Sequence, residues 1–322
     1  MAVKAWMRVL RIILTTKSPG QTGKNKQLVI EEDAFGVGLS VNVTGNKYMS
    51  TLKDNCTVKI SNLSYAEIVQ IIMGQYYNIK VECGYKSSSL MTVFDGGVMY
   101  ISNLRESVDT NTVTLLCASH LVASYGQRRI NLSFNSGINL YSAINFVCKV
   151  GGVPNPNIST QFKKRFLDEI TNASNQTAAE WISGQTNKNG SYISSSDCVG
   201  NSFMTMFDAS KSNSRVIKLN TDTLLFTNGF PRLTTDGLVF SVMPTFAFQC
   251  GDTIVMDNAI IQINVDSQSE AMKNLGGLLD KNGQYMIFEI HYMLQNRGQN
   301  FYFEIRAKTR SRISAYLGKE LG

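Results

Sequence analysis

The stretch that decides the fold runs from Leu224 to Lys308. It begins LLFTNGFPRLTTDGLVFSVMPTFAFQCGDTIVMD, crosses a polar segment, and ends GQYMIFEIHYMLQNRGQNFYFEIRAK. Apolar and polar residues alternate in its last part, which is the period of a half-buried strand. Clusters of Gly, Pro, Asn and Asp separate the alternating segments and are typical of turns. The stretch therefore predicts a first strand, a second ending near Cys250, a third beginning at Thr253, and a closing hairpin turned by residues 296–298.

Five residues are expected to shape the turns of this stretch. Gly229, Phe230 and Pro231 form a corner that leads into the first strand. Pro231 fixes its own φ and restrains the residue before it to an extended conformation. Gly237 and Gly251 are expected in turns where a positive φ is needed, which glycine adopts without steric cost. These are structural residues, and nothing in the stretch indicates catalysis.

The first third of the chain, residues 1 to about 120, also predicts mostly strands. The start, MAVKAWMRVLRIIL, alternates as a first strand does. Arg8 and Arg11 interrupt the uncharged run that a signal peptide needs, so we expect synthesis and folding in a cytoplasm. Ser64 precedes Glu67 by three residues, which predicts a capping box and one short helix.

A hairpin is expected after the strand that follows this helix. The two arms would be Met91–Phe94 and Val98–Ile101, with Asp95-Gly96-Gly97 as the turn between them. Such a Gly-rich sequence between two apolar runs is a common hairpin signal.

The middle of the chain, residues 122–214, has a different pattern. Helical spacing of apolar residues predicts helices at about 138–148, 162–170 and 203–207. Thr177 and Glu180 predict a further capping box and helix start. The stretches 171–177 and 183–202, rich in Asn, Ser, Thr and Gly, are expected to be surface loops. The sequence thus predicts a mixed α/β insert between two β regions.

Three N-terminal segments and the C-terminal stretch together resemble the tail-hub (baseplate hub) proteins of contractile-tailed bacteriophages. The segments are VKISNLS at Val58–Ser64, IKVECGY at Ile79–Tyr85 and VFDGGVMYI at Val93–Ile101. The resemblance is one of pattern and turn chemistry over most of the chain. It implies a mainly β fold with two tail-tube-like β-barrels, residues 1–121 and 215–322, flanking a mixed middle domain, residues 122–214.

The same resemblance implies a structural role in a virion. A homotrimer would form a ring that joins the six-fold tail tube to the three-fold spike, with baseplate wedge proteins around it. The tape measure protein is a further candidate partner, and DNA would pass through the ring without specific binding. The implied location is the tail baseplate, after assembly in the host cytoplasm. No enzymatic activity, cofactor or metal is implied.

Composition leaves one alternative function open. The 322 residues carry a net charge of +7 and no apolar run long enough for a membrane span. Basic residues cluster at Lys17/Lys24/Lys26, Arg128/Arg129, Lys163/Lys164/Arg165 and Arg306/Lys308/Arg310/Arg312. They are scattered over separate elements, which is more typical of solvated surface than of one nucleic-acid face. A basic nucleic-acid-binding β-barrel protein remains the alternative.

Residues that could carry out catalysis are few. The chain has two histidines. His120 follows Cys117 by three residues, but a catalytic thiol–imidazole pair needs a third, orienting group. His291 lies in phase with Glu289 on one strand face, where a cross-strand polar contact is the favoured interpretation and a third metal ligand is missing. Paired carboxylates cannot be recognised from spacing alone, so a secreted glycan-binding or cell-wall hydrolytic β protein stays as a further alternative.

The six cysteines are dispersed, with no C-x-x-C pair. Cys56, Cys83 and Cys117 lie in phase with apolar strand residues, which predicts small buried side chains on strand faces. Structural disulfides are the minority interpretation, because cytoplasmic conditions disfavour them.

Overall fold

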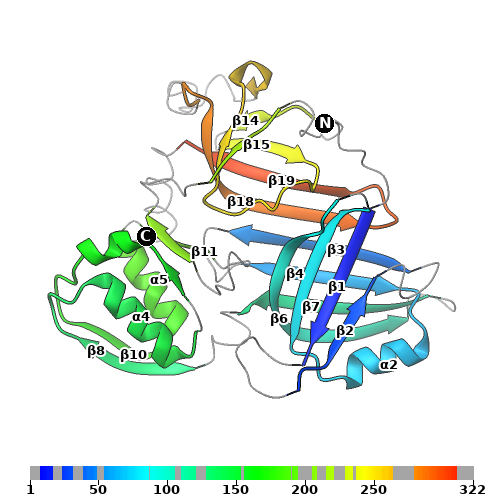
Figure 1. The fold of residues 1–322 in the computed structure, drawn as a ribbon, viewed down its shortest axis with the longest axis horizontal. Helices are drawn as coiled ribbons and strands as arrows, with labels where there is room; N and C mark the ends of the chain where they lie inside the picture. The colour runs from blue at the N-terminus through cyan, green and yellow to red at the C-terminus, as the bar shows by residue number, and fades with distance from the viewer. Residues whose placement is uncertain are drawn as a thin grey trace.

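The computed structural model describes residues 8–16, 24–31, 39–48, 54–86, 88–105, 110–120, 128–153, 156–189, 191–194, 205–208, 215–220, 229–234, 237–263 and 279–309. The protein is mainly β with a smaller α/β insert, as predicted (Figure 1). Its elements are β1 (Arg8–Thr15), β2 (Gln27–Ile30), β3 (Ser40–Tyr48), β4 (Asn55–Ser61), α2 (Tyr65–Met73), β5 (Asn78–Tyr85), β6 (Met91–Arg105), β7 (Asn111–Ser119), β8 (Arg129–Phe134), α4 (Leu140–Gly151), β9 (Asn157–Ile158), η1 (Thr160–Lys164), β10 (Thr171–Thr177), α5 (Ala178–Asn189), β11 (Ser191–Ser194), β12 (Thr205–Asp208), β13 (Val216–Lys218), β14 (Arg232–Thr234), β15 (Gly237–Val242), β16 (Thr253–Val255), η3 (Asn258–Ile260), β17 (Gln262–Ile263), β18 (Gln284–Gln295) and β19 (Phe301–Lys308).

Strands from both ends of the chain form one 14-stranded sheet. Its main path is β17-β14-β15-β19-β18-β3-β4-β7-β6-β5-β1-β2, with β13 and β16 attached beside β18. The two ends meet where β18 pairs antiparallel with β3, from Glu289 opposite Tyr48 to Gln295 opposite Asn42. We call this pairing the seam. One hydrophobic core, from Leu10 to Ala307, lies on both sides of it.

The two β regions predicted from the sequence are therefore joined, both through the seam and through their core. Their organisation as two barrels stays a prediction, because the strand pairs of the described residues form a single path with β17 and β2 at its ends. Both predicted domain boundaries, after residues 121 and 214, fall outside the described residues.

The N-terminal strands and helix follow the sequence pattern. Leu10, Ile12 and Leu14 alternate along β1 and are buried, as the period of two requires. At the start of α2, the predicted capping box is present, with the Ser64 hydroxyl accepting from the Glu67 amide and the Glu67 carboxylate accepting from the Ser64 amide. The short helix in the first third of the chain is thus confirmed.

The predicted hairpin at residues 91–101 is wrong, because β6 continues through Asp95-Gly96-Gly97 without a turn. Gly96 lies where two strands approach closely. A Cβ atom there would lie 2.3 Å from the Ala118 carbonyl oxygen and 2.6 Å from the Phe94 ring. The glycine therefore provides space inside a long, irregular strand.

The middle of the chain forms its own α/β unit with a separate core, drawn in green in Figure 1. Helices α4 and α5 pack together beside the antiparallel pair β8–β10. A second, three-stranded sheet has the order β11-β12-β9. Trp181 is buried in this core against Phe134. The Thr177–Glu180 capping box is present at the start of α5, as predicted.

Several elements of this middle unit were predicted incorrectly. The segment 162–170 is the short 3-10 helix η1 followed by extended chain, because its backbone bonds to the start of α4 through the Leu140 amide and the Arg165 carbonyl oxygen, 2.8 Å apart. The expected loop at 171–177 is strand β10, and the expected loop at 183–202 contains the end of α5 and β11. The expected helix at 203–207 overlaps strand β12. Strand β10 is polar and is held by backbone pairing with β8, so side-chain periodicity does not reveal it. At 203–207 the spacing of apolar residues indicated a helix, whereas β12 pairs with β11 and β9.

The C-terminal stretch matches its prediction at most points. Strand β16 begins at Thr253, and β18 and β19 form the closing hairpin around residues 296–300. The second strand, however, ends at Val242, well before Cys250. Pro244 follows closely and has no amide proton for a ladder bond, so the chain turns through residues 243–252 instead.

Candidate functional site

A polar cluster on one face of the joined sheet is the candidate site, because it crosses the seam. The apolar residues that alternate with it on β18 and β19, among them Tyr292 and Ile305, are buried in the core. Two neighbouring cross-strand rows make up the seam cluster: Asn46–His291–Glu304 and Tyr48–Glu289–Arg306. It therefore combines β3 from the first region with β18 and β19 from the last.

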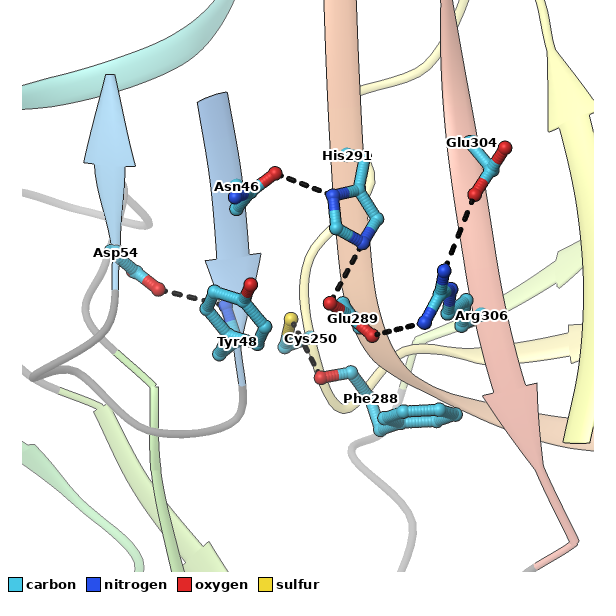
Figure 2. A network of polar contacts seen from close by, with 9 residues as sticks. All are labelled: Asn46, Tyr48, Asp54, Cys250, Phe288, Glu289, His291, Glu304 and Arg306. Atoms are coloured by element: carbon cyan, nitrogen blue, oxygen red, sulfur yellow. Dashed lines mark hydrogen bonds and ion pairs between the residues drawn. The ribbon is translucent and has the colours of Figure 1, made fainter. Parts of the chain in front are cut away.

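Each carboxylate oxygen of Glu289 lies next to a basic side chain (Figure 2). The His291 Nε2 atom lies 2.7 Å from Oε1, and the Arg306 Nη1 atom lies 3.4 Å from Oε2. On the other side of the imidazole, Nδ1 lies 2.5 Å from the side-chain oxygen of Asn46. The imidazole thus bridges β18 to β3, as the sequence analysis favoured for His291.

The electrostatics of the cluster favour the ionised form of the Glu289 carboxylate, whose charge is balanced by Arg306. Burial alone would raise the pKa of Glu289, but the hydrogen bond and charge of His291, together with Arg306, hold that pKa below its usual value. Burial and the neighbouring Glu289 raise the pKa of the Tyr48 hydroxyl. A carboxylate held between an imidazole and a guanidinium is suited to fixing strands in register, and its lowered pKa makes it a weak acceptor for a substrate proton.

A β-bulge places Glu289 in this cluster. The pairing of β18 with β19 shifts between Ile287 and Glu289, so Phe288 is the extra residue. The turn before β16 holds the bulge on its other side. The Gly251 amide donates to the Ile287 carbonyl oxygen at 2.7 Å, and the Ile287 amide donates to the Asp252 carbonyl oxygen at 2.9 Å. These two bonds therefore extend the pairing of β16 with β18 as far as the bulge.

This supporting turn contains a positive-φ glycine and a buried acid. Gly251 has φ 93°, a conformation that residues with a Cβ atom rarely adopt. The Asp252 side chain is fully buried and accepts a hydrogen bond from the Gln249 amide at 2.8 Å. The Nε atom of Arg215 lies 3.6 Å from its Oδ2 atom. Burial raises the pKa of Asp252 to about 6, despite the opposing effect of Arg215.

The predicted corner lies next to the seam cluster. Gly229 has φ 99°, Phe230 is 51% exposed, and the Pro231 carbonyl oxygen accepts from the Gln262 amide at 2.7 Å. A pocket of about 270 Å³ opens beside the corner, and Glu304 of the seam cluster lies on its wall. Its lining residues are Gly229, Phe230, Arg232, Val239, Phe240, Ser241, Tyr302 and Glu304.

Gly237 is the first residue of β15 and pairs with Thr234 at the end of β14. It has φ 131°, and a Cβ atom there would lie 2.5 Å from the Ala307 carbonyl oxygen on β19. All five sequence-predicted turn residues therefore lie in the C-terminal half of the sheet. Gly229 and Phe230 share a pocket, Gly237 packs on β19, and Gly251 supports the bulge of β18.

His120 does not pair with the cysteine that precedes it. Its Nε2 atom lies 2.7 Å from the Asp95 carboxylate, on β6. Burial and the neighbouring Cys56 raise the pKa of the Cys117 thiol, so a thiolate is strongly disfavoured. The arrangement ties the end of β7 to β6 and lacks an activated nucleophile.

Five of the six cysteines lie in the described part of the chain, and all five are free and buried: Cys56, Cys83, Cys117, Cys148 and Cys250. The prediction of small buried side chains on strand faces is confirmed for Cys56, Cys83 and Cys117, whereas Cys148 is buried on α4 and Cys250 in the turn before β16. Cys198 lies outside the described residues.

The basic clusters in the described ranges largely contact other groups of the protein. Arg306 pairs with Glu289, and Lys308 lies over the Phe288 ring at 4.5 Å. Lys163 lies over the Tyr141 ring at 5.0 Å, and Arg129 donates to the Asn175 carbonyl oxygen. Lys17, Arg310 and Arg312 are outside the described residues. These contacts give no support for a nucleic-acid face.

Within the same described ranges, no group of three or more His, Cys, Asp or Glu side chains could hold a metal ion. Nor does any helix there have the length and apolar character needed to span a membrane.

Sequence reasoning found part of the seam cluster and missed the rest. The strand phase of Glu289 and His291 was visible, and Arg306 was noted as one basic residue among many. Asn46 and Tyr48 carried no signal, because their contacts join segments about 240 residues apart. The role of Asp252 in supporting the bulge likewise depends on tertiary contacts alone.

Comparisons with known proteins give structural matches only. No protein-family profile matches the chain, and no curated protein matches its sequence. A 43 kDa tail protein of prophage MuSo2 from Shewanella oneidensis superposes with TM-score 0.56 and 12% identity, over 96% of this chain and 98% of that one. At this identity, the likeness concerns the fold.

Two secretion proteins share the same fold. The E. coli c3393 protein, a type VI secretion component described as structurally similar to the T4 phage tail proteins gp27 and gp5, matches with TM-score 0.53 and 9% identity, over 84% of this chain and 73% of that one. A chain of the Francisella PdpA-VgrG complex matches with TM-score 0.50 and 8% identity, over 95% of this chain and 53% of that one. The chain therefore has the fold of phage tail proteins and of related type VI secretion proteins.

Proposed function

We propose that this protein is a structural component of a phage tail, and that it acts as the central hub adaptor of the baseplate. Three copies form a ring that joins a six-fold tail tube on one side to a three-fold spike on the other. Wedge proteins surround the ring, and the tape measure protein is a candidate contact along the axis. DNA passes through the ring without specific binding.

The observation that carries this proposal is the joined sheet. The seam fixes two β regions in one register around one core, so each copy is a rigid double unit. Three double units offer six similar β regions to a six-fold tube while keeping three-fold symmetry for a spike. The full-length match to a prophage tail protein supports the same assignment.

We further propose that the protein has no enzymatic activity. His120 contacts Asp95 on β6, and His291 contacts Asn46 on β3 as well as Glu289 on its own strand. These contacts hold neighbouring strands together. We expect purified protein to release no fragments from peptidoglycan. Hydrolysis by the wild type that is lost in the folded variants His120→Gln or His291→Gln would contradict this.

The mass of the purified protein in solution, alone and mixed with the cognate spike, tests the hub assignment. We expect three copies per particle, and cross-links to both tube and spike in assembled tails. A six-copy stoichiometry, or cross-links that place the chain in the sheath or capsid, would overturn the assignment. Binding to nucleic acid that weakens steeply with salt would favour the alternative of a basic DNA- or RNA-binding protein.

A further inference from the structure

Strand β6 has one edge that its neighbours cover only in part. Strand β5 pairs with it from Met91 to Gly97, and the Val98 amide donates to the Tyr77 carbonyl oxygen at 2.8 Å. Strand β7 covers the opposite edge as far as Arg105. Among the described residues, the stretch Met99–Leu104 therefore has no strand partner on the β5 side. We call this stretch the β6 edge.

The β6 edge opens with a β-bulge, because Met99 is the extra residue where the pairing with β7 shifts between Val98 and Tyr100. Two other features that commonly prevent strand addition, charge and proline, are missing from it. Its sequence, MYISNL, contains no charged residue and no proline. Met99 is 52% exposed, Tyr100 is 59% exposed and Leu104 is 62% exposed. Leu116, directly opposite Tyr100 on β7, is exposed as well. A long, uncharged, apolar edge of this kind favours pairing with another chain.

The apolar surface continues from the β6 edge toward helix α2. Tyr77 bonds to Val98 through its backbone, and its side chain is exposed. Four residues earlier, Met73 ends α2 and is 75% exposed. The outward face of α2 also carries Tyr65, Val69 and Ile72, opposite the buried Ile68 and Ile71. An apolar second face on a surface helix indicates that another surface covers it in the assembled state.

We propose that the β6 edge pairs with a strand of a second copy of this chain, so that the sheet continues from one subunit to the next. This inference rests on the proposed ring and names its contact. Copies that each carry a net charge of +7 repel one another, so they approach most easily where the surface is uncharged. A nucleic acid would instead need basic residues here, and Met99–Leu104 supplies none.

The contact is head-to-tail. The path of the sheet ends at β2 and β17, so each copy has other edges to offer to its neighbour. A contact between two different surfaces closes into a ring of three when it rotates each copy by a third of a turn, whereas a contact of the β6 edge with itself would stop at a dimer.

Charged substitutions on the exposed side chains of the β6 edge test the proposal. We expect the double variant Tyr100→Lys, Leu104→Lys to keep the far-ultraviolet circular dichroism and melting temperature of the monomer. Its trimer dissociation constant should rise at least tenfold, measured by sedimentation. Phe166→Lys is the matched control, because Phe166 is 56% exposed but belongs to the middle unit, and it should leave the trimer unchanged.

Hydrogen exchange gives a second measurement on the unmodified chain. Those amides of Met99–Leu104 that point away from β7 should exchange more slowly in the trimer than in the dilute monomer, because an added strand accepts their hydrogen bonds. Equal exchange in the two states, or a variant trimer as stable as the wild type, would overturn the β6 contact and leave the ring proposal intact. Protection that appears only with spike present would assign the edge to the spike. A chain that stays monomeric with tube and spike would overturn the ring itself.

Discussion

The joined sheet is held by contacts between distant parts of the sequence, whereas the middle unit is held by contacts between parts that lie close in sequence. The sheet brings together β3 and β18, some 240 residues apart, around a core that spans the chain from Leu10 to Ala307. In the described residues, the core of the middle unit extends from Ile130 to Ile182, with α4 and α5 packed on strands close to them in sequence. The sheet is therefore one cooperative structure that needs both chain ends, whereas the middle unit has the contacts of an independent insert.

Deleting Phe301–Arg306 is expected to have the largest effect, because it should unfold the joined sheet and leave the middle unit folded. The deletion removes most of β19, which pairs with both β18 and β15, and takes Phe301, Phe303 and Ile305 out of the core. Each such side chain contributes about 1.5–3 kcal/mol by burial, against a total stability of roughly 5–15 kcal/mol. We expect loss of the joined sheet, and with it of any assembly.

Tryptophan fluorescence shows whether the middle unit survives that deletion. The chain has two tryptophans, and Trp6→Phe leaves Trp181, which is buried in the middle core, as the only reporter. We expect its emission to stay at the wavelength of a buried indole while slow amide exchange in β18 disappears. Emission that shifts to the wavelength of an exposed indole in the same variant would show that the two structures unfold together.

The same contrast explains what the sequence could predict. Burial alternates along β1, β19 and the second half of β18, from Ile290 onward, so the existence and the buried faces of these strands were visible. The capping boxes at Ser64 and Thr177 also gave true helix starts. Local patterns were reliable where side-chain burial follows the period of the backbone.

Predictions failed where a tertiary contact overrides the local pattern. Asp95-Gly96-Gly97 has turn chemistry, but Gly96 lies against the Ala118 carbonyl oxygen inside a continuous strand. In the middle unit, β10 is polar along most of its length and is held by pairing with β8. The seam cluster was half visible, because strand phase reveals Glu289 and His291 but says nothing of their partners on β3.

The next largest effect is expected from Asp252, whose pKa is raised from 3.8 to about 6 by burial. The folded state holds this proton more tightly than the unfolded state. Asp252 therefore lowers the stability of the sheet as pH rises from about 4 to about 6, and the full penalty, about 3 kcal/mol, applies above that range. Asp252→Asn keeps an acceptor for the Gln249 amide and removes the titration.

We expect Asp252→Asn to be more stable than wild type at pH 8 and to lose this advantage toward pH 4. Urea unfolding at a series of pH values measures the difference. A difference that stays constant with pH would show that the charge of Asp252 is fully compensated in the fold, by Arg215 above all.

A smaller loss of stability is expected from a substitution at Gly251. A substitution at Gly184, in the middle unit, is its control. Valine at φ 93° is strained, so Gly251→Val should lower the free energy of unfolding by roughly 1–3 kcal/mol. Gly184, inside α5, has open space around its Cα, and Gly184→Ala should be neutral or stabilise the helix by up to about 1 kcal/mol. Chemical denaturation midpoints compare the two, and an unchanged midpoint in Gly251→Val would contradict the role given to the turn at β16.

The smallest effect is expected within the seam cluster itself. Arg306 is 39% exposed, so its pairing with Glu289 is partly screened by water and should contribute about 0.5–1 kcal/mol. A double-mutant cycle of Glu289→Gln and Arg306→Gln isolates that coupling from the cost of each single change. Unfolding should be followed both by slow amide exchange on β18 and by Trp181 fluorescence in the Trp6→Phe background. A cluster that fixes the seam should change the first measurement and leave the second untouched. Strict additivity of the two substitutions would mean that strand pairing and core packing hold the seam without help from these charges.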